Sequence, residues 1–114
     1  MARRRVVVTG LGIVSPVGNS VEEAWQNILA GKSGIAAVTK FDVSTFPVKF
    51  AGEVKNFDIT QYISAKDARR MDDFIHFGLA AGIQAVRDAG LDKENVVDLE
   101  RVGVAIGSGI GGLP

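Results

Sequence analysis

Two glycine-rich stretches are the first places in this sequence where the backbone could hold a ligand. Residues 5–18 contain a run of three consecutive valines, which a turn with Gly10, Gly12 and Gly18 follows. Residues 107–112 form a second glycine-rich turn after another apolar run. Glycine turns between a buried strand and a helix bind the phosphates of dinucleotides in many enzymes. A nicotinamide-dependent oxidoreductase is therefore one hypothesis.

The first turn departs from the dinucleotide-binding pattern. That pattern has a third glycine where Ser15 stands, and here Pro16 follows and the next helix begins only after Ser20. A helix that starts so late cannot direct its N-terminal N–H groups at a phosphate held by Gly10. Residues 31–33 read Gly-Lys-Ser, but they follow a helix and lack the upstream glycine of a P-loop. We therefore predict a packing turn.

The next candidate is a cluster of basic residues ahead of a long apolar stretch. Lys66, Arg69 and Arg70 lie within five positions, and the spacings of three and four place Lys66 near both arginines on one helical face. Two interpretations stay open. The cluster is a solvated surface, or it is a docking patch for an acidic partner, because clustered cations in a neutral chain create a directional local field.

Several kinds of chemistry are absent from these residues. There is no cysteine, which excludes disulfides, thiolate metal ligands and a thiol nucleophile, and the single histidine excludes an imidazole dyad. That histidine, His76, lies off the centre of an apolar helical stripe, so we interpret it as a partly exposed residue with a local hydrogen bond. We expect no cofactor-binding site, no metal site and no catalytic residue within this sequence.

The composition is that of a globular protein. Of the 114 residues, 46% are hydrophobic and 23% are charged, and 13 basic residues balance 13 acidic ones. A formal charge of zero does not favour nucleic acid or an anionic membrane surface as a partner. The sequence shows neither a secretory leader nor an apolar run long enough to span a membrane, which predicts a cytoplasmic location.

Two helices are predicted from local signals. Ser20 and Glu23 form a capping box ahead of a helix at 21–30 that Gly31 ends, and Trp25 on its apolar stripe is predicted to anchor the core. Ser64, with Asp67 three residues later, opens a second helical region. Apolar residues at helical spacing continue from 71 to 86, up to Gly90. The stripe includes two glycines, at 78 and 82, which predicts close approach by a neighbouring backbone.

Three strands complete the prediction. The apolar runs at 6–8 and 102–106 are typical of strands buried on both faces, and 48–54 alternates as a short edge strand that Pro47 begins. A parallel sheet needs helices over both faces, yet only two central strands and two or three helices are available. We therefore predict an α/β protein in which residues 1–114 are the front part of a larger domain, with no complete domain boundary inside the chain.

Taken together, the motifs resemble the N-terminal part of a β-ketoacyl-acyl-carrier-protein synthase. They match in order and spacing over essentially the whole sequence, and the closest likeness is to the type II synthase of dissociated bacterial fatty acid synthesis. The residues that carry the resemblance are 4–19, 31–35, 50–52, 69–72 and 107–112.

The resemblance implies a fold and a reaction. The family has a thiolase-like layered α-β-α-β-α fold of two similar halves, usually paired as a homodimer, and this chain would supply part of the first half. The implied reaction is a decarboxylating Claisen condensation of acyl and malonyl thioesters on acyl carrier protein. A cysteine at a helix N-terminus carries the acyl group and two histidines stabilise the developing oxyanion.

The resemblance also assigns roles to residues. Lys66, Arg69 and Arg70 fall where the family has basic residues that contact the acidic carrier protein, and Ile110 falls on the residue that lines and gates the acyl-chain pocket. The catalytic cysteine and histidines have no counterpart here, and His76 matches neither histidine, so these residues alone are expected to be inactive. Two alternatives stay open: a Rossmann-type NAD(P)-dependent oxidoreductase and a non-catalytic carrier-protein-binding module.

Overall fold

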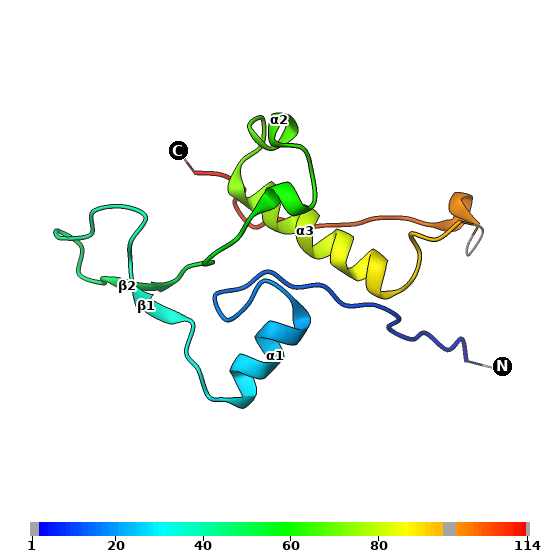
Figure 1. Cartoon of the computed structure of the whole chain (residues 1–114), viewed down its shortest axis with the longest axis horizontal. Helices are drawn as coiled ribbons and strands as arrows, with labels where there is room; N and C mark the ends of the chain where they lie inside the picture. The colour runs from blue at the N-terminus through cyan, green and yellow to red at the C-terminus, as the bar shows by residue number, and fades with distance from the viewer. Residues whose placement is uncertain (1–2, 95–97, 114) are drawn as a thin grey trace.

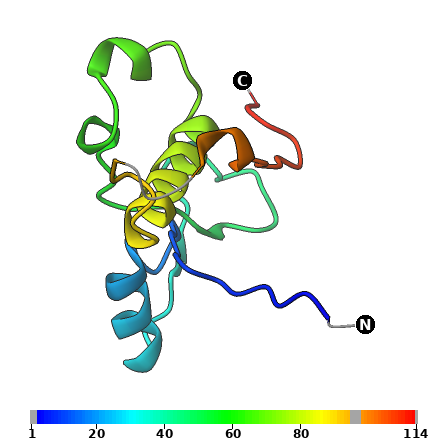
Figure 2. The same ribbon diagram turned by 90° about the vertical axis from the view of Figure 1, so that its right-hand side faces the viewer.

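Helix α3 (Asp73–Asp88) is the centre of the computed structural model, which describes residues 3–94 and 98–113. Two extended segments, from the beginning and the end of the chain, run along this helix (Figure 1). Helices α1 (Val21–Leu29) and α2 (Ala65–Ala68) lie on opposite sides of α3 in both views (Figure 1, Figure 2). Short 3₁₀ turns occur at Ile59–Gln61 and Leu99–Arg101.

The start and end of α1 follow the predicted signals. The Glu23 N–H donates to Ser20 Oγ at 3.2 Å, and the Glu23 carboxylate accepts from the Asn19 N–H at 2.8 Å. These bonds satisfy backbone donors that no helical carbonyl reaches, as a capping box does. Gly31 has φ +66°, the left-handed conformation that ends a helix at little cost to glycine. The predicted helix at 21–30 is confirmed to within one residue.

Helices α2 and α3 divide the second predicted helical region. Ser64 Oγ accepts from the Asp67 N–H at 3.1 Å and donates to the Asp67 carboxylate at 2.6 Å, which confirms the expected cap of α2. Helix α3 begins at Asp73 and continues to Asp88, and Gly90 follows with φ +70°. The long helix and its glycine stop are therefore confirmed, and the helix begins two residues later than predicted.

The β-structure among the described residues is a small hairpin outside the helices. Strand β1 (Ile35–Ala37) pairs antiparallel with β2 (Phe50–Gly52), with Ile35 opposite Gly52. Strand β2 confirms the predicted strand at 48–54 in a shorter form. The sequence did not predict β1, because three small or apolar residues show no alternation.

The predicted buried strands at 6–8 and 102–106 are wrong for the described residues. Both segments are extended but unpaired, and Val6 and Val104 are 91% and 82% exposed. A central strand needs neighbours at both edges and cover on both faces, and here α3 is the main cover. Trp25 is likewise 56% exposed and not the expected core anchor.

The core that these residues form is correspondingly small. The buried apolar residues are three alanines, one from each helix: Ala24, Ala68 and Ala80. Alanine has no large side chain, so these positions mark where segments approach closely and contribute little buried apolar area. Among the described residues, no helix combines the length and the apolar character that crossing a membrane requires.

Candidate functional site

The glycine turn after the first valines packs directly on the backbone of α3. A methyl group added to Gly12 would overlap the carbonyl of Ala81, and one added to Gly10 would overlap that of Ala85. A backbone can approach a helix this closely only where both surfaces lack side chains. The geometry confirms the predicted packing turn.

Two polar side chains of α3 hold the same turn. The Leu11 N–H donates to Asp88 Oδ2 at 2.9 Å, and the Ile13 N–H donates to Gln84 Oε1 at 3.2 Å. The amide group of Gln84 also donates to the Asn19 carbonyl at 2.8 Å and to the Tyr62 hydroxyl at 3.0 Å. Two N–H groups that a bound phosphate would need are therefore already occupied, which speaks against a dinucleotide site.

The three basic residues predicted to form a docking patch lie in and just after α2. Lys66 is within the helix, Arg69 is its C-cap and Arg70 is the next residue, and all three side chains are exposed. Over residues 3–94 and 98–113, none of them takes part in an ion pair. We call Lys66, Arg69 and Arg70 the basic patch. All three therefore lie on one short exposed stretch in and just after α2.

The single histidine connects the basic patch to α3. His76 Nε2 lies 2.9 Å from the carbonyl oxygen of Ala68, the last residue of α2. Because a carbonyl only accepts, Nε2 carries the proton in this contact. The side chain is partly exposed, as predicted, at 14%, but its hydrogen bond joins α3 to α2 and is less local than predicted.

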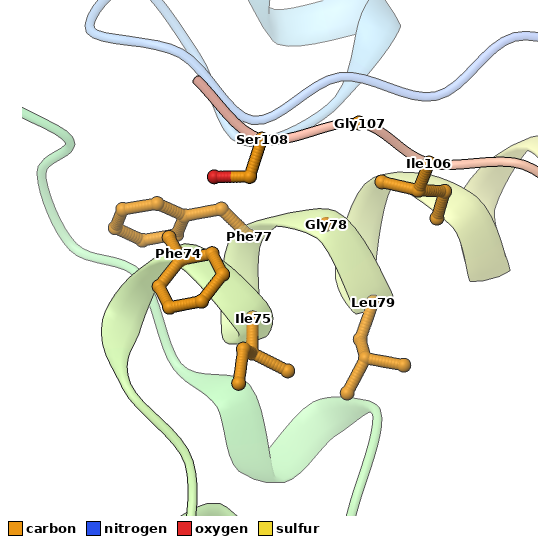
Figure 3. A pocket seen from close by; sticks show the side chains of 8 residues that line it. All are labelled: Phe74, Ile75, Phe77, Gly78, Leu79, Ile106, Gly107 and Ser108. Carbon is orange, nitrogen blue, oxygen red and sulfur yellow. The ribbon is translucent and has the colours of Figure 1, made fainter. Parts of the chain in front are cut away.

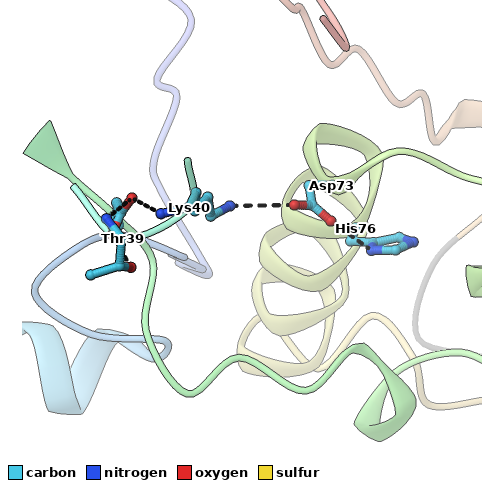
Figure 4. A network of polar contacts seen from close by, with 5 residues as sticks. Thr39, Lys40, Asp73 and His76 are labelled. Carbon is cyan, nitrogen blue, oxygen red and sulfur yellow. Dashed lines mark hydrogen bonds and ion pairs between the residues drawn. The ribbon is translucent and has the colours of Figure 1, made fainter. Parts of the chain in front are cut away.

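Asp73 lies between His76 and the hairpin and forms an ion pair with Lys40. Asp73 lies with one carboxylate oxygen 3.8 Å from His76 Nδ1 and the other 3.3 Å from Lys40 Nζ (Figure 4). The Lys40 N–H and the Thr39 N–H and hydroxyl donate to Glu53, at 3.1, 3.1 and 2.8 Å. The bonds from Thr39 hold the pKa of the Glu53 carboxyl below its ordinary value of 4.5.

An apolar cavity of about 480 Å³ lies between α3 and the C-terminal extended segment (Figure 3). Its walls include Phe74, Phe77 and Leu79 of α3 and Ile106 of the segment. The Ile106 side chain approaches Gly78, 3.7 Å from where a Cβ would lie. The expected close approach of a neighbouring backbone is therefore wrong at this position, since a side chain makes the contact at ordinary distance.

Ile110 lies on the glycine-rich turn beside this cavity and is 78% exposed. The Gly111 N–H donates to Ser108 Oγ at 3.0 Å, and Gly111 has φ +82°. The Phe74 ring lies against Gly111, with its nearest atom 3.5 Å from the position of a Cβ. Ile110 is not among the residues that line the cavity, but Phe74 contacts both the cavity and the turn that carries Ile110.

Comparison with known proteins gives a consistent result. Residues 3–113 match the model of the β-ketoacyl synthase N-terminal domain. The chain is 59% identical over 113 residues to a 3-oxoacyl-[acyl-carrier-protein] synthase 2 of Vibrio cholerae, covering 99% of this chain and 27% of that protein. A protein of the same description from Coxiella burnetii is 51% identical over 114 residues, covering 100% of this chain and 27% of its own length.

A solved structure supports the same placement. It is described as the ishigamide ketosynthase/chain length factor, with a TM-score of 0.68 and 38% sequence identity. The match covers 78% of this chain and 22% of that one. The chain thus spans about a quarter of the length of the curated relatives it matches.

Proposed function

Because this chain belongs to the β-ketoacyl synthase family, whose N-terminal domain it matches over residues 3–113, we propose that the complete protein elongates acyl chains on acyl carrier protein. The observation that carries the proposal is 59% identity over 113 residues to a 3-oxoacyl-[acyl-carrier-protein] synthase 2. The α/β class and the ketosynthase fold, which is thiolase-like, are confirmed by the match to the solved ketosynthase.

The proposed reaction is a decarboxylating condensation. A cysteine thiolate displaces the carrier thiol from an acyl thioester and becomes acylated. Malonyl-carrier protein then loses carbon dioxide, and the carbanion that remains attacks the acyl-enzyme carbonyl, forming a carbon–carbon bond and releasing the thiolate. Two histidines stabilise the oxyanion. Residues 1–114 contain no cysteine and only His76, so the groups that do this chemistry lie outside them.

The chain is, in this proposal, an incomplete N-terminal portion of the first thiolase-like half. Support comes from its exposed apolar surface: Val6, Val104 and Trp25 are all more than half exposed. Large apolar side chains exposed to this extent are consistent with segments that another element covers. The remaining elements of the layered fold cover these segments in the complete protein, which pairs as a homodimer.

The basic patch is the docking surface for acyl carrier protein. Its support is the exposure of Lys66, Arg69 and Arg70 together with their lack of ion-pair partners among the described residues. An acidic partner gains from such a patch mainly through faster, salt-dependent association. Replacing all three residues with glutamate is expected to weaken carrier-protein binding at least tenfold at low salt, measured by titration at two ionic strengths. Unchanged binding would reduce the patch to a solvated surface.

Ile110 lines and gates the acyl-chain pocket in the same proposal. The neighbouring cavity is walled by aromatic and aliphatic side chains, which suit an acyl chain better than a polar substrate. The turn that carries Ile110 packs on Phe74, so a change of this turn would alter one wall of the cavity.

Two alternatives are less well supported. An NAD(P)-dependent oxidoreductase would need the N–H groups of Leu11 and Ile13, which Asp88 and Gln84 occupy. A nicotinamide titration of the complete protein should show no saturable binding. A non-catalytic carrier-protein-binding module would bind the carrier but form no product.

The test of the proposal uses the verified complete protein with acyl- and malonyl-carrier protein. We expect release of carbon dioxide and a β-ketoacyl product two carbons longer than the acyl substrate. Carrier binding without product would favour the non-catalytic module. Absence of both binding and product would overturn the proposed function.

A further inference from the structure

We propose that His76 is the positioning residue of the basic patch: its Nε2–H group fixes helix α2, and with α2 the orientation of the three cations. The inference rests on the proposed function, because it concerns the same docking surface. It assigns a role to the one histidine of the sequence, which does not match a catalytic position of the family.

Helix α2 is too short to hold itself in place. It has four residues, Ala65–Ala68, and isolated helices below about 12 residues are marginal in water. The Ser64 cap satisfies N–H groups at its start, and Ala68 buries a methyl group, but the side chains of Lys66 and Arg69 extend into solvent. A bond from α3 adds a constraint on its direction that the short helix does not supply itself.

The His76 hydrogen bond supplies that anchor. Nε2 contacts the Ala68 carbonyl at 2.9 Å, and both residues are largely buried, with the His76 side chain 14% exposed. A bond shielded from water holds its geometry better than an exposed one. The Met71 N–H donates to the same carbonyl at 3.1 Å, so Ala68 is fixed both by the chain that follows and by α3.

The bonded carbonyl lies at the centre of the basic patch. Ala68 comes two residues after Lys66 and directly before Arg69, so fixing its peptide limits rotation of the short helix about its axis. A partner that meets preorganised cations does not have to order them on binding. Loss of the His76 bond should therefore lower affinity for the carrier protein without touching the reacting groups.

Neighbouring charges do not provide the same constraint. The Lys40–Asp73 ion pair is exposed on both sides, at 52% and 68%, and Asp73 lies 3.8 Å from His76 Nδ1. Exposed pairs of this kind contribute little to stability. Because Asp73 also contacts His76, the control is taken from a carboxylate elsewhere, Glu22 in the first turn of α1.

The experiment compares His76→Leu and His76→Gln in the complete protein. Leucine fills similar space without a donor, whereas the glutamine amide can donate to the Ala68 carbonyl. We expect His76→Leu to raise KM for malonyl-carrier protein about fivefold to tenfold, with kcat unchanged, as loss of one buried hydrogen bond predicts. Its kcat/KM with a malonyl thioester of a small thiol should match the unchanged protein. His76→Gln should restore KM to within about twofold, and the control Glu22→Gln should leave KM unchanged.

Several outcomes separate this inference from the proposed function. Equal losses with carrier-borne and small thioesters, together with a lower unfolding temperature, would make His76 merely structural and overturn the inference. A normal KM for His76→Leu, while charge reversal of the patch weakens binding, would overturn it and leave the proposed function standing. Should the leucine variant not fold, His76→Met offers similar volume without a donor and must show the same rise in KM. A complete protein that forms no product from either thioester would overturn both proposals.

Discussion

Helix α3 holds the two extended segments of the chain in different ways. Toward the first segment, its backbone touches Gly10 and Gly12, and Gln84 and Asp88 bond to the segment's N–H groups. Toward the last segment, side chains make the contacts: Ile106 lies at ordinary distance from Gly78 beside an open apolar cavity, and the Phe74 ring lies against Gly111. The first contact tolerates no added atom and leaves no unbonded N–H at Leu11 or Ile13. The second is held by side-chain packing alone.

This difference indicates which part of the fold the described residues determine by themselves. Close backbone contact plus hydrogen bonds fixes direction and distance, whereas a few apolar side-chain contacts beside a cavity constrain both less tightly. The first segment can therefore keep its place on α3 even while Val6 is exposed. The position of the last segment depends more on the elements that would cover it.

Gly12→Val should cause the largest loss of stability at the contact between α3 and the first segment. The new side chain would overlap the Ala81 carbonyl, and a helix backbone cannot move aside without losing its own hydrogen bonds. We expect a loss of about 3 kcal/mol or more in the free energy of unfolding of the complete protein, measured in urea. The control is Lys32→Val, at an exposed position of the loop after α1. Equal effects of the two substitutions would contradict the packing-turn interpretation.

The hydrogen bonds between Gln84 and the first segment predict the second largest loss of stability. Gln84→Leu keeps the size of the side chain but removes the bonds to Ile13, Asn19 and Tyr62. Because all three of these bonds are part-buried, the expected loss is about 2 kcal/mol in the free energy of unfolding. The exposed Gln61 serves as control, and Gln61→Leu should change stability by less than about 0.5 kcal/mol. A neutral Gln84→Leu would show that packing alone holds the first segment.

Local signals in the sequence predicted local structure well. The Ser20–Glu23 pair and Gly31 set both ends of α1, and Gly90 marked the end of α3, because caps and left-handed glycines act within a few residues of the chain. Pro16 similarly indicated that the first turn packs instead of binding phosphate. Such features depend little on the rest of the molecule.

Contacts between distant segments could not be predicted in the same way. Trp25 and the valines at 6–8 have the composition of buried residues, but burial needs covering elements that residues 1–114 do not provide in this structure. The bond from His76 to Ala68 joins two helices, and no spacing rule indicates that a ring nitrogen will meet that carbonyl. The basic patch was visible as charge alone, and its partner followed only from family resemblance.

Gly78→Ala tests the contact between α3 and the last segment, and here we expect a small gain in stability. Gly78→Ala places a methyl group 3.7 Å from Ile106, which is an ordinary contact, and alanine favours a helix over glycine by about 1 kcal/mol. We expect the free energy of unfolding to rise by about 0.5 to 1 kcal/mol, measured beside Gly12→Val. Destabilisation as large as that of Gly12→Val would mean that a backbone approaches Gly78 in the complete protein, making the two sides of α3 alike.

The smallest predicted effect concerns the hairpin, whose stability depends on the charge of Glu53. Hydrogen bonds from Thr39 and Lys40 lower the pKa of Glu53 from its ordinary 4.5, so the folded hairpin favours the ionised carboxylate. The stabilisation is present above the unfolded pKa and is lost as pH falls through the folded one. Amide hydrogen exchange at Thr39, corrected for the intrinsic rate, should therefore lose protection as the pH falls below 4.5.

Glu53→Gln tests the cause of that pH dependence. The variant should already show reduced protection at neutral pH, because a neutral amide accepts less strongly than a carboxylate, and it should change little on acidification. Glu22→Gln, a substitution in the first turn of α1, should leave Thr39 protection unchanged. Amides of α3 should keep their protection in all these proteins, since their bonds do not involve Glu53. Loss of protection in α3 together with Thr39 would show that the hairpin and the helix open as one unit, through the Lys40–Asp73 pair.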